Sequence, residues 1–345
     1  MALQASGQIK YSEIIAEFGT PISGGIGEYR LSENVGTLTN LPLDTGVPQS
    51  GQIKFSDFYS KRLNQVVDLY SIGNNSSRQV AKDRWNNGNV HIVGSTKTTK
   101  TQPPDTVDDR VIINVNATIR SVKGTQTHCA LRTGNWDSGT VLEIEIGTSG
   151  KLYGSGGNGG NGGSANETAG TNGQTGSSAL GIEYPCSINN LGIIQSGYGG
   201  GGGGGGNTRT TGGGKKSGAT TNGSSGGGGG GGAGLPAGDA GGVQTPLAVG
   251  GGSAGSAGQA GSLSGQASGG AGGSEAGTGG NSSPVNNSAS KANDGGIYSS
   301  DGSQQSANGG IGGNNGFAII TNQGSAPSLS GGGVTGRTIT STNPT

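Results

Sequence analysis

The sequence predicts a mostly β and irregular fold. A small helical N-terminal attachment region and a short β domain would precede a polyglycine-II helical sandwich anchored by β-turn rungs. Three observations lead to this fold class. The chain has 80 glycines among 345 residues, with unbroken runs at 199–206 and 226–232. Apolar and acidic residues alternate over Val141–Ile146, as in a half-buried strand. A short motif occurs twice near the N-terminus. We therefore expect three domains, at residues 1–64, 65–150 and 151–345.

The N-terminal motif spans residues 6–13 and 50–57. It reads Ser-Gly-Gln-Ile-Lys, then an aromatic residue, Ser and an acid. Each copy predicts a short helix with Ser12 or Ser56 as its N-cap. Such small apolar helices bury little surface alone, so they indicate modules that dock on a partner; a compact cap on the next domain is the alternative. The residues expected to make this attachment are Ile9, Tyr11, Ile14, Phe18, Ile53, Phe55, Phe58 and Tyr59.

The β domain is predicted from apolar periodicity. Arg78–Asn86 has the pattern of a helix, whereas Val90–Val93, Val111–Ile119 and Val141–Ile146 are typical of strands. Together they predict a β-rich shoulder over residues 65–150.

The glycine-rich remainder favours an ordered structure over a linker. Collagen is excluded because its glycines recur at every third position with abundant proline, whereas here they form runs and the chain has 11 prolines. A flexible Gly/Ser linker is the other interpretation. Without Cβ atoms, however, extended chains with three residues per turn can approach closely enough to hydrogen-bond each other through the backbone. We expect this arrangement, although ordering glycine costs more conformational entropy than ordering other residues.

Short apolar steps precede or follow the glycine tracts. A strand, a turn and a Gly-apolar-x-Gly step occur at Gly150–Gly154, Gly192–Gly197 and Gly333–Arg337, and we expect them to anchor one end of the glycine helices. Polar segments would connect the helices, with alternate connections at the free end. These segments are Ser164–Ser178, Asn207–Ser225, Leu235–Val249, Asn281–Asn293 and Tyr298–Asn308.

Several classes of function are disfavoured by composition. The net charge is zero, so no electrostatic footprint for nucleic acid is present. No apolar run has the length of a membrane span, and we expect no signal peptide. A Gly-x-Ser-x-Gly string at 251–255 lacks the strand, helix and later His of a nucleophile elbow. The acids after residue 150 are scattered and no His/Cys/acid cluster occurs. We expect no enzyme activity, no cofactor and no metal. Cys129 and Cys186 are either bridged or two free thiols.

Two stretches flank the first glycine tracts in a characteristic order. A strand leads into Gly150–Gly160, and Ile188–Ile194 precedes a long tract from Gly197. Over residues 65–345, this pattern resembles the distal tail-fibre adhesins of T-even-type bacteriophages. The resemblance implies a polyglycine-II sandwich whose distal loops bind a host receptor, usually an outer-membrane protein, and mounting on the tip of a trimeric fibre. The N-terminal repeats resemble short modules in structural proteins of other tailed phages, including cyanophages.

The predicted function is therefore that of a virion protein, a receptor-binding adhesin at a tail-fibre tip, assembled in the host cytoplasm. A fibre or baseplate connector without receptor contact is the alternative. Basic loop residues would meet acidic lipopolysaccharide or an acidic receptor loop, and apolar or aromatic tips would supply contact area. The residues expected to bind the receptor are Arg209, Lys215, Lys216, Leu235, Pro236, Pro246, Leu247 and Tyr298.

Overall fold

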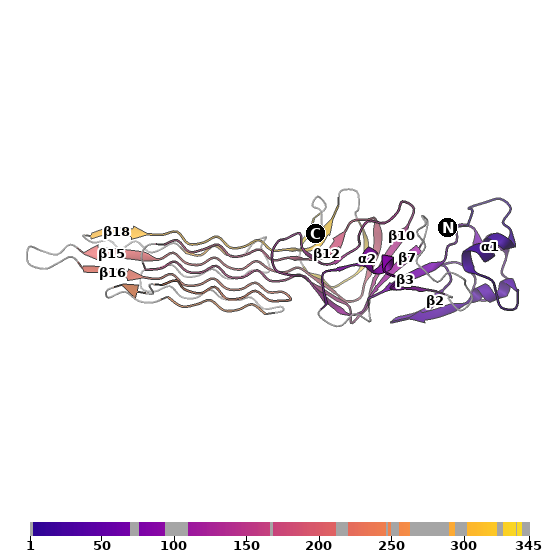
Figure 1. The fold of residues 1–345 in the computed structure, drawn as a ribbon, viewed down its shortest axis with the longest axis horizontal. Coiled ribbons are helices and arrows are strands. Elements are labelled where there is room, and N and C mark those ends of the chain that lie inside the picture. Colours follow the sequence, from indigo (N-terminus) through magenta and orange to yellow (C-terminus); the bar gives the residue numbers. More distant parts are fainter. Residues whose placement is uncertain are drawn as a thin grey trace, which may run out of the picture.

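The protein is an elongated, mostly β molecule with few helices (Figure 1). The computed structural model describes residues 3–69, 76–93, 110–165, 168–211, 220–245, 248–249, 255–262, 290–293, 302–322, 327–335 and 337–339. The N-terminal region and the glycine-rich segments lie at opposite ends, with strands between them.

The described elements follow one another along the chain with short helices confined to the first part. The helices are α1 (Tyr11–Phe18), η1 (Ile26–Arg30), η2 (Phe55–Phe58) and α2 (Ala81–Asn86), where η marks a 3-10 helix. The strands up to the first glycine tract are β1 (Ser32–Val35), β2 (Leu38–Pro42), β3 (Asn64–Asp68), β4 (Ser76–Ser77), β5 (Gln79–Val80), β6 (Val90–Ile92), β7 (Arg110–Val115), β8 (Thr118–Arg120), β9 (Cys129–Arg132), β10 (Val141–Ile146) and β11 (Lys151–Tyr153). The later strands are β12 (Ser178–Ile182), β13 (Cys186–Asn190), β14 (Ile193–Gln195), β15 (Asn207–Thr211), β16 (Thr220–Ser224), β17 (Ala248–Val249), β18 (Gly302–Ser306), β19 (Phe317–Thr321), β20 (Ser328–Gly331), β21 (Val334–Thr335) and β22 (Arg337–Ile339).

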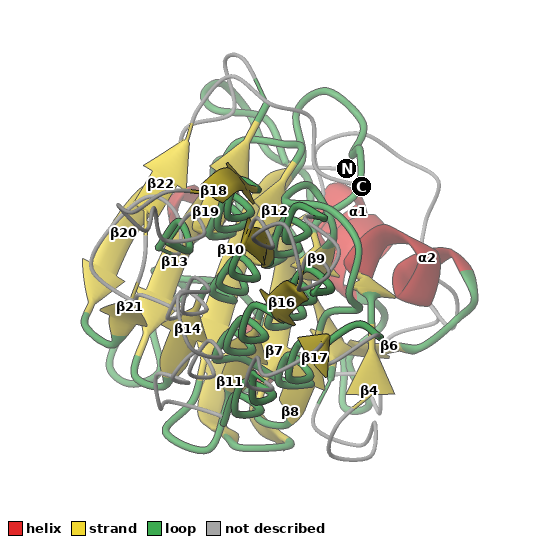
Figure 2. Cartoon of the chain, turned by 90° about the vertical axis from the view of Figure 1, so that its left-hand side faces the viewer, coloured by secondary structure: helices red, strands yellow, loops and turns green. Residues whose placement is uncertain are grey.

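Three sheets built almost entirely of parallel strands form the central β region. Their strand orders are β20-β13-β10-β7-β3-β6, β21-β14-β11-β8-β4 and β22-β19-β12-β9-β5. Apart from the edge strand β6, the chain visits the three sheets in turn, so each group of three strands forms one coil of a three-sided solenoid. Successive coils follow one another across Figure 2. Ile113, Ile119 and Leu131, one from each sheet, are fully buried in a single apolar cluster inside the coils.

Long insertions leave two of these coils at the same corner. The chain departs after β11 and returns at β12, then departs after β14 and returns at β19. In the adjacent coil, which consists of β7, β8 and β9, a short loop between β8 and β9 forms the same corner. The expected boundary at residue 150 therefore lies inside the β region, because β12–β14 and β19–β22 pair with strands that precede it. The predicted strand over Val111–Ile119 is two strands, β7 and β8, on different sides of the solenoid.

The N-terminal region packs as a cap on this solenoid. Phe18, Tyr29 and Phe58 contact one another with ring centroids 5.7–6.0 Å apart, in a cluster that also includes Ile92 of β6. The β1–β2 hairpin adds a second cluster, in which Val35 packs with residues of β3 and β7. The alternative of a compact cap is thus the arrangement seen.

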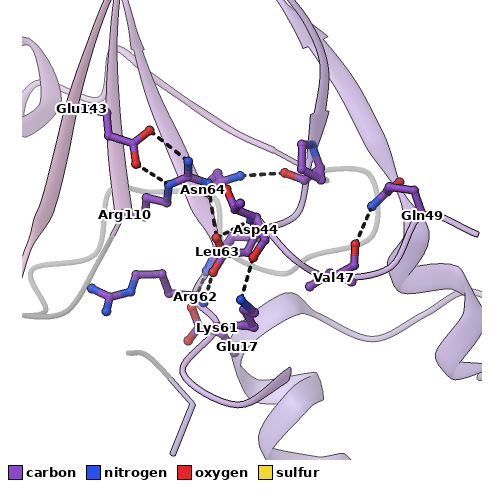
Figure 3. A network of polar contacts seen from close by, with 12 residues as sticks. Glu17, Asp44, Val47, Gln49, Lys61, Arg62, Leu63, Asn64, Arg110 and Glu143 are labelled. Atoms are coloured by element: carbon purple, nitrogen blue, oxygen red, sulfur yellow. Dashed lines mark hydrogen bonds and ion pairs between the residues drawn. The ribbon is translucent and has the colours of Figure 1, made fainter. Parts of the chain in front are cut away.

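Polar contacts join the cap to the solenoid (Figure 3). Arg110 of β7 donates from Nε and Nη2 to both carboxylate oxygens of Glu143, at 3.0 and 2.9 Å. Its Nη1 lies 2.8 Å from Asn64 Oδ1 and 3.3 Å from Asp44 Oδ1. Glu17 of α1 accepts the backbone N–H of Leu63 at 2.8 Å.

The predicted N-caps Ser12 and Ser56 were wrong. The helices begin at Tyr11 and Phe55, so Lys10 and Lys54 are the N-cap residues. The reason is the acid three residues later in each motif. The carboxylates of Glu13 and Asp57 accept the backbone N–H of Lys10 and Lys54, both at 2.7 Å, which is the carboxylate half of a capping box.

Among the described residues, seven extended glycine-rich segments and the short segment 290–293, which contains no glycine, lie side by side along the long axis of the molecule (Figure 1). We call them the slab; they are residues 154–165, 168–177, 196–206, 225–234, 238–245, 255–262, 290–293 and 307–316. Backbone N–H groups of 196–206 point to three neighbours in turn with a period of three residues. Residues 197, 200, 203 and 206 donate to 168–177, residues 198, 201 and 204 donate to 225–234, and residues 202 and 205 donate to 290–293.

The position of a segment in the slab determines how much glycine it needs. Segments 196–206 and 225–234 are surrounded by others and almost wholly buried. A Cβ at Gly200 would lie 2.0 Å from Asn158 O, and one at Gly229 would lie 2.0 Å from Gly201 O. Outer segments such as 168–177 face solvent on part of their circumference and have glycine at every third position. The unbroken glycine runs thus mark the interior of the slab.

Candidate functional site

The end of the slab farthest from the N-terminal region carries a polar four-stranded sheet. Its strand order is β17-β16-β15-β18, and all its pairs are antiparallel. Three of its strands lie at the left end of Figure 1. Their sequences are Asn-Thr-Arg-Thr-Thr, Thr-Thr-Asn-Gly-Ser and Gly-Ser-Gln-Gln-Ser. We call this the distal sheet.

The glycine segments position the distal sheet. β15 continues segment 196–206, β16 runs into segment 225–234, and β18 precedes segment 307–316. Asn207, Ser224 and Ser225 at the junction are buried, so the strands begin inside the bonded slab. A sheet of hydroxyl and amide side chains has little apolar surface to bury. Its register is set by the segments that enter it.

Of the three predicted basic residues, the structure describes Arg209, which belongs to the distal sheet. Arg209 lies at the middle of β15, where its Cα pairs with Asn222 on one side and Gln304 on the other. Lys215 and Lys216 lie between β15 and β16 in sequence, outside the described residues, as do Pro246, Leu247 and Tyr298. The β-branched threonines of β15 and β16 were the missed signal for these two strands.

The prediction of an exposed tip at Leu235 and Pro236 was wrong. Both residues are half-buried and lie at the solenoid end of the slab. The backbone N–H of Leu235 donates to Gly154 O at 2.9 Å, and Pro236 O accepts the N–H of Gly156 at 2.9 Å. The chain runs from the solenoid toward the distal sheet in segments 154–165 and 196–206. It runs back toward the solenoid in segments 168–177 and 225–234. The turn that follows 225–234 and contains Leu235 and Pro236 therefore lies at the solenoid end of the slab.

The prediction for the fibre-attachment residues also needs correction. Ile9, Ile14, Phe18 and Phe58 are buried in the cap, because they form the core that holds its short helices together. Tyr11, Ile53 and Tyr59 are half-buried and Phe55 is exposed. Ile22, which the motif does not include, has 80% of its surface exposed. These last five residues remain able to contact a partner.

The described residues present no cluster of metal-ligating side chains. Within the described ranges, no group of three His, Cys, Asp or Glu side chains could hold a metal ion. The groups with raised pKa values are spread over the cap, the β region and the slab; they are Tyr29, Glu145, Tyr153, Cys186 and Tyr198. Burial raises the pKa of Cys186 to about 12, and burial raises the pKa of Glu145 against an opposing hydrogen bond from Asn189. Cys129 and Cys186 form no disulfide bond. In the described part of the chain, no helix has the length and apolarity to cross a membrane.

The arrangement is a polar sheet at the end of a slab whose segments are joined by backbone hydrogen bonds. A comparison with known families identifies the class of protein. The model of the phage tail fibre adhesin Gp38 family matches residues 84–344, which is more than half of the chain. The chain therefore belongs to the phage tail fibre adhesin Gp38 family, a family of structural adhesins.

A solved structure is also similar. It is the crystal structure of the gp37-gp38 adhesin tip complex of the bacteriophage S16 long tail fiber, with 20% sequence identity and a TM-score of 0.41, over 96% of this chain and 99% of that chain. No curated protein matched the sequence.

Proposed function

We propose that this adhesin binds a host cell-surface receptor through the distal sheet and the segments that connect its strands. The observation that carries the proposal is the position of the distal sheet, at the end of a cross-bonded slab and opposite the N-terminal cap (Figure 1). A binding surface on a rigid scaffold is the usual arrangement in recognition proteins. An outer-membrane protein or lipopolysaccharide is the proposed receptor, since Arg209 of the distal sheet and Lys215 and Lys216, a few residues later in the sequence, would attract an acidic surface.

The slab is proposed to be a polyglycine-II sandwich. The three-residue period of its backbone hydrogen bonds supports this structure, because a chain with three residues per turn directs successive N–H groups to three neighbours. The N–H groups of 197 to 206 that donate to other backbone segments follow this order. The function of such a slab would be to present the distal residues already ordered, so that little entropy is lost on binding.

The opposite end is proposed to attach to the tip of a trimeric tail-fibre protein, which would place the chain on the virion at the fibre tip. Supporting this role, Ile22 and Phe55 are exposed, and the Tyr11 and Phe55 rings meet edge to face with centroids 6.2 Å apart. Residues 1–64 would then serve attachment, the solenoid would connect, and the glycine-rich insertions would recognise the host.

The proposal is tested by charge reversal at the distal end. The variants are Arg209→Glu and the double variant Lys215→Glu with Lys216→Glu, each in phage that display the adhesin. We expect adsorption to host cells to fall at least tenfold, because reversed charges repel an acidic partner. The matched control is Lys151→Glu in β11, far from the distal sheet, which should adsorb normally.

The competing function is a connector that never contacts the receptor. Deletion of residues 212–219 distinguishes the two. A connector would tolerate the deletion with unchanged adsorption, whereas a receptor-binding tip would lose adsorption while the purified protein keeps its thermal stability. Unchanged adsorption in both the deletion and the charge reversals would overturn the proposal.

A further inference from the structure

The loop between β8 and β9, residues 121–128, contacts the slab as well as the solenoid. It follows β8 at the corner where the two long insertions leave the neighbouring coils. Its backbone is tied to the solenoid, since the N–H of Ser121 donates to Tyr153 O at 2.8 Å. The hydroxyl of Ser121 closes the loop by donating to His128 O at 3.1 Å. We call this loop the collar.

Lys123 of the collar joins two slab segments. Its Nζ donates to Asn158 Oδ1 at 2.8 Å and to Asp239 Oδ2 at 2.7 Å. Asn158 belongs to segment 154–165 and Asp239 to segment 238–245. The same Asn158 oxygen accepts the backbone N–H of Asp239 at 2.9 Å. One ammonium group therefore completes a junction between two neighbouring segments and the solenoid.

The rest of the collar contacts two further segments. Thr175 of segment 168–177 donates from its hydroxyl to Gly124 O at 3.2 Å. Gln126 donates from Nε2 to Asn315 O, in segment 307–316. Gly124 has φ +147°, and a Cβ there would lie 2.9 Å from the His128 ring. The tight turn thus brings the loop backbone within reach of the slab.

The four contacted segments belong to one bonded body. Inside the slab, backbone hydrogen bonds connect the segments along their length, whereas its covalent links to the solenoid are the four crossings after β11, before β12, after β14 and before β19. A rigid body on a narrow base tilts about that base. The collar holds the base from one side through four segments, including segment 238–245, which no strand of the solenoid directly precedes or follows in sequence.

The length of the slab makes such tilt important. At about 3 Å per residue along segment 196–206 and about 3.4 Å per residue along β15, the far end of the distal sheet lies about 50 Å from the base. A tilt of about 10° would displace it by about 9 Å at that length.

We propose that the collar is an orienting device and that Lys123 is its principal positioning residue, fixing the direction of the slab relative to the solenoid. This goes beyond receptor binding and does not depend on it. Asp239 has 74% of its side chain exposed, and exposed ion pairs contribute little to stability. The effect of Lys123 should therefore appear in the slab's direction and hardly in the unfolding temperature.

The experiment measures distances between two spin labels, one on the solenoid and one on the slab. Labels at Leu191→Cys and Ala257→Cys, both exposed positions, are introduced after Cys129→Ala and Cys186→Ser remove the native thiols. We expect a narrow distance distribution in this background, and at least a twofold broader one after Lys123→Met. Adding Thr175→Val should broaden it further.

Four controls separate orientation from folding. Lys123→Arg should retain the narrow distribution, and Lys151→Met, on β11 away from the collar, should not change it. Salt at about 1 M should broaden the distribution in the protein that keeps Lys123 and should have little effect in the Lys123→Met variant, since surface ion pairs are screened. Amide exchange inside the slab, at Gly200 and Gly203, should stay slow in every variant.

An unchanged width in the Lys123→Met, Thr175→Val double variant would overturn the proposal. Broadening that appears only with faster amide exchange inside the slab would also overturn it, because the slab itself would then have loosened. No host cell is involved, so this outcome is independent of the receptor-binding test.

Discussion

A single added methyl group should disrupt the interior of the slab. At Gly203, a Cβ would lie 1.9 Å from Asn161 O, far inside the separation of about 3.5 Å at which such atoms touch. Asn161 O also accepts the N–H of Thr171 at 2.8 Å, Gly203 donates to Thr171 O at 2.9 Å, and Gly310 donates to Gly203 O at 2.7 Å. Because the segments must separate to admit the methyl group, Gly203→Ala should break these three hydrogen bonds.

The magnitude follows from those bonds. Each contributes about 1 kcal/mol net, so their loss costs about 3 kcal/mol. Alanine restricts the unfolded chain and returns at most about 1 kcal/mol. Gly203→Ala should therefore lower the free energy of unfolding by at least about 2 kcal/mol, measured by denaturant titration with amide exchange of the slab as a second probe.

Gly242→Ala is the matched control in the same slab. A Cβ at Gly242 has Asn161 Oδ1 at 3.6 Å as its nearest neighbour, an ordinary contact distance, so its effect should stay within about 0.5 kcal/mol. Equal stability of the two variants would refute the conclusion that close backbone approach requires the glycine runs.

Three further predictions concern the solenoid and its cap. Arg110→Met should lower the free energy of unfolding by about 3 kcal/mol, because it leaves Asp44, whose side chain is 8% exposed, without its charged partner; Arg110→Lys should lose less, and equal stability of all three proteins in urea would contradict this. Burial raises the pKa of Glu145 above its ordinary 4.5, so the folded protein keeps this proton to higher pH than the unfolded chain. The stability linked to Glu145 is thus fully present below pH 4.5 and is lost as pH rises through the raised pKa. Glu145→Gln should remove this loss, so the stability of the variant relative to the wild type should increase from acid to neutral pH. Parallel curves of unfolding free energy against pH for the two proteins would refute a raised pKa at Glu145. Since Cys129 and Cys186 form no disulfide bond, dithiothreitol should leave the melting temperature unchanged, and a lower melting temperature would reveal a disulfide.

The sequence predicted elements whose cause is local. The strand over Val141–Ile146 was predicted with the bounds it has, because its alternation reflects one buried face. The short helix ahead of Gly19 was also predicted, but its start was misplaced. A serine was taken as the N-cap, whereas the Glu13 carboxylate accepts the Lys10 N–H and lets the helix begin earlier.

The solenoid could not be predicted in this way because its pairings are not local. β13 pairs in parallel with β10 on one side and with β20 on the other, and more than 130 residues separate β13 from β20 in the chain. The polar sequence of β20, Ser-Leu-Ser-Gly, has no alternation long enough to mark a strand. β20 is extended because it pairs with β13 of the adjacent coil.

The end of the slab at which a predicted binding residue lies depends on how many times the chain has crossed the slab before that residue. The apolar pair Leu235 and Pro236 was predicted as an exposed tip from its composition alone. Each of the first four glycine tracts crosses the slab once, so connections alternate between the free end and the base, and the pair follows a return crossing. The connection between β15 and β16 follows an outward crossing and contains the Lys215 and Lys216 pair. The order of crossings therefore favours the connection with Lys215 and Lys216 over the turn with Leu235 and Pro236 as the proposed receptor contact, independently of composition. Charge reversal there tests that ranking directly, because Leu235→Asp at the base should leave adsorption unchanged wherever the protein still folds.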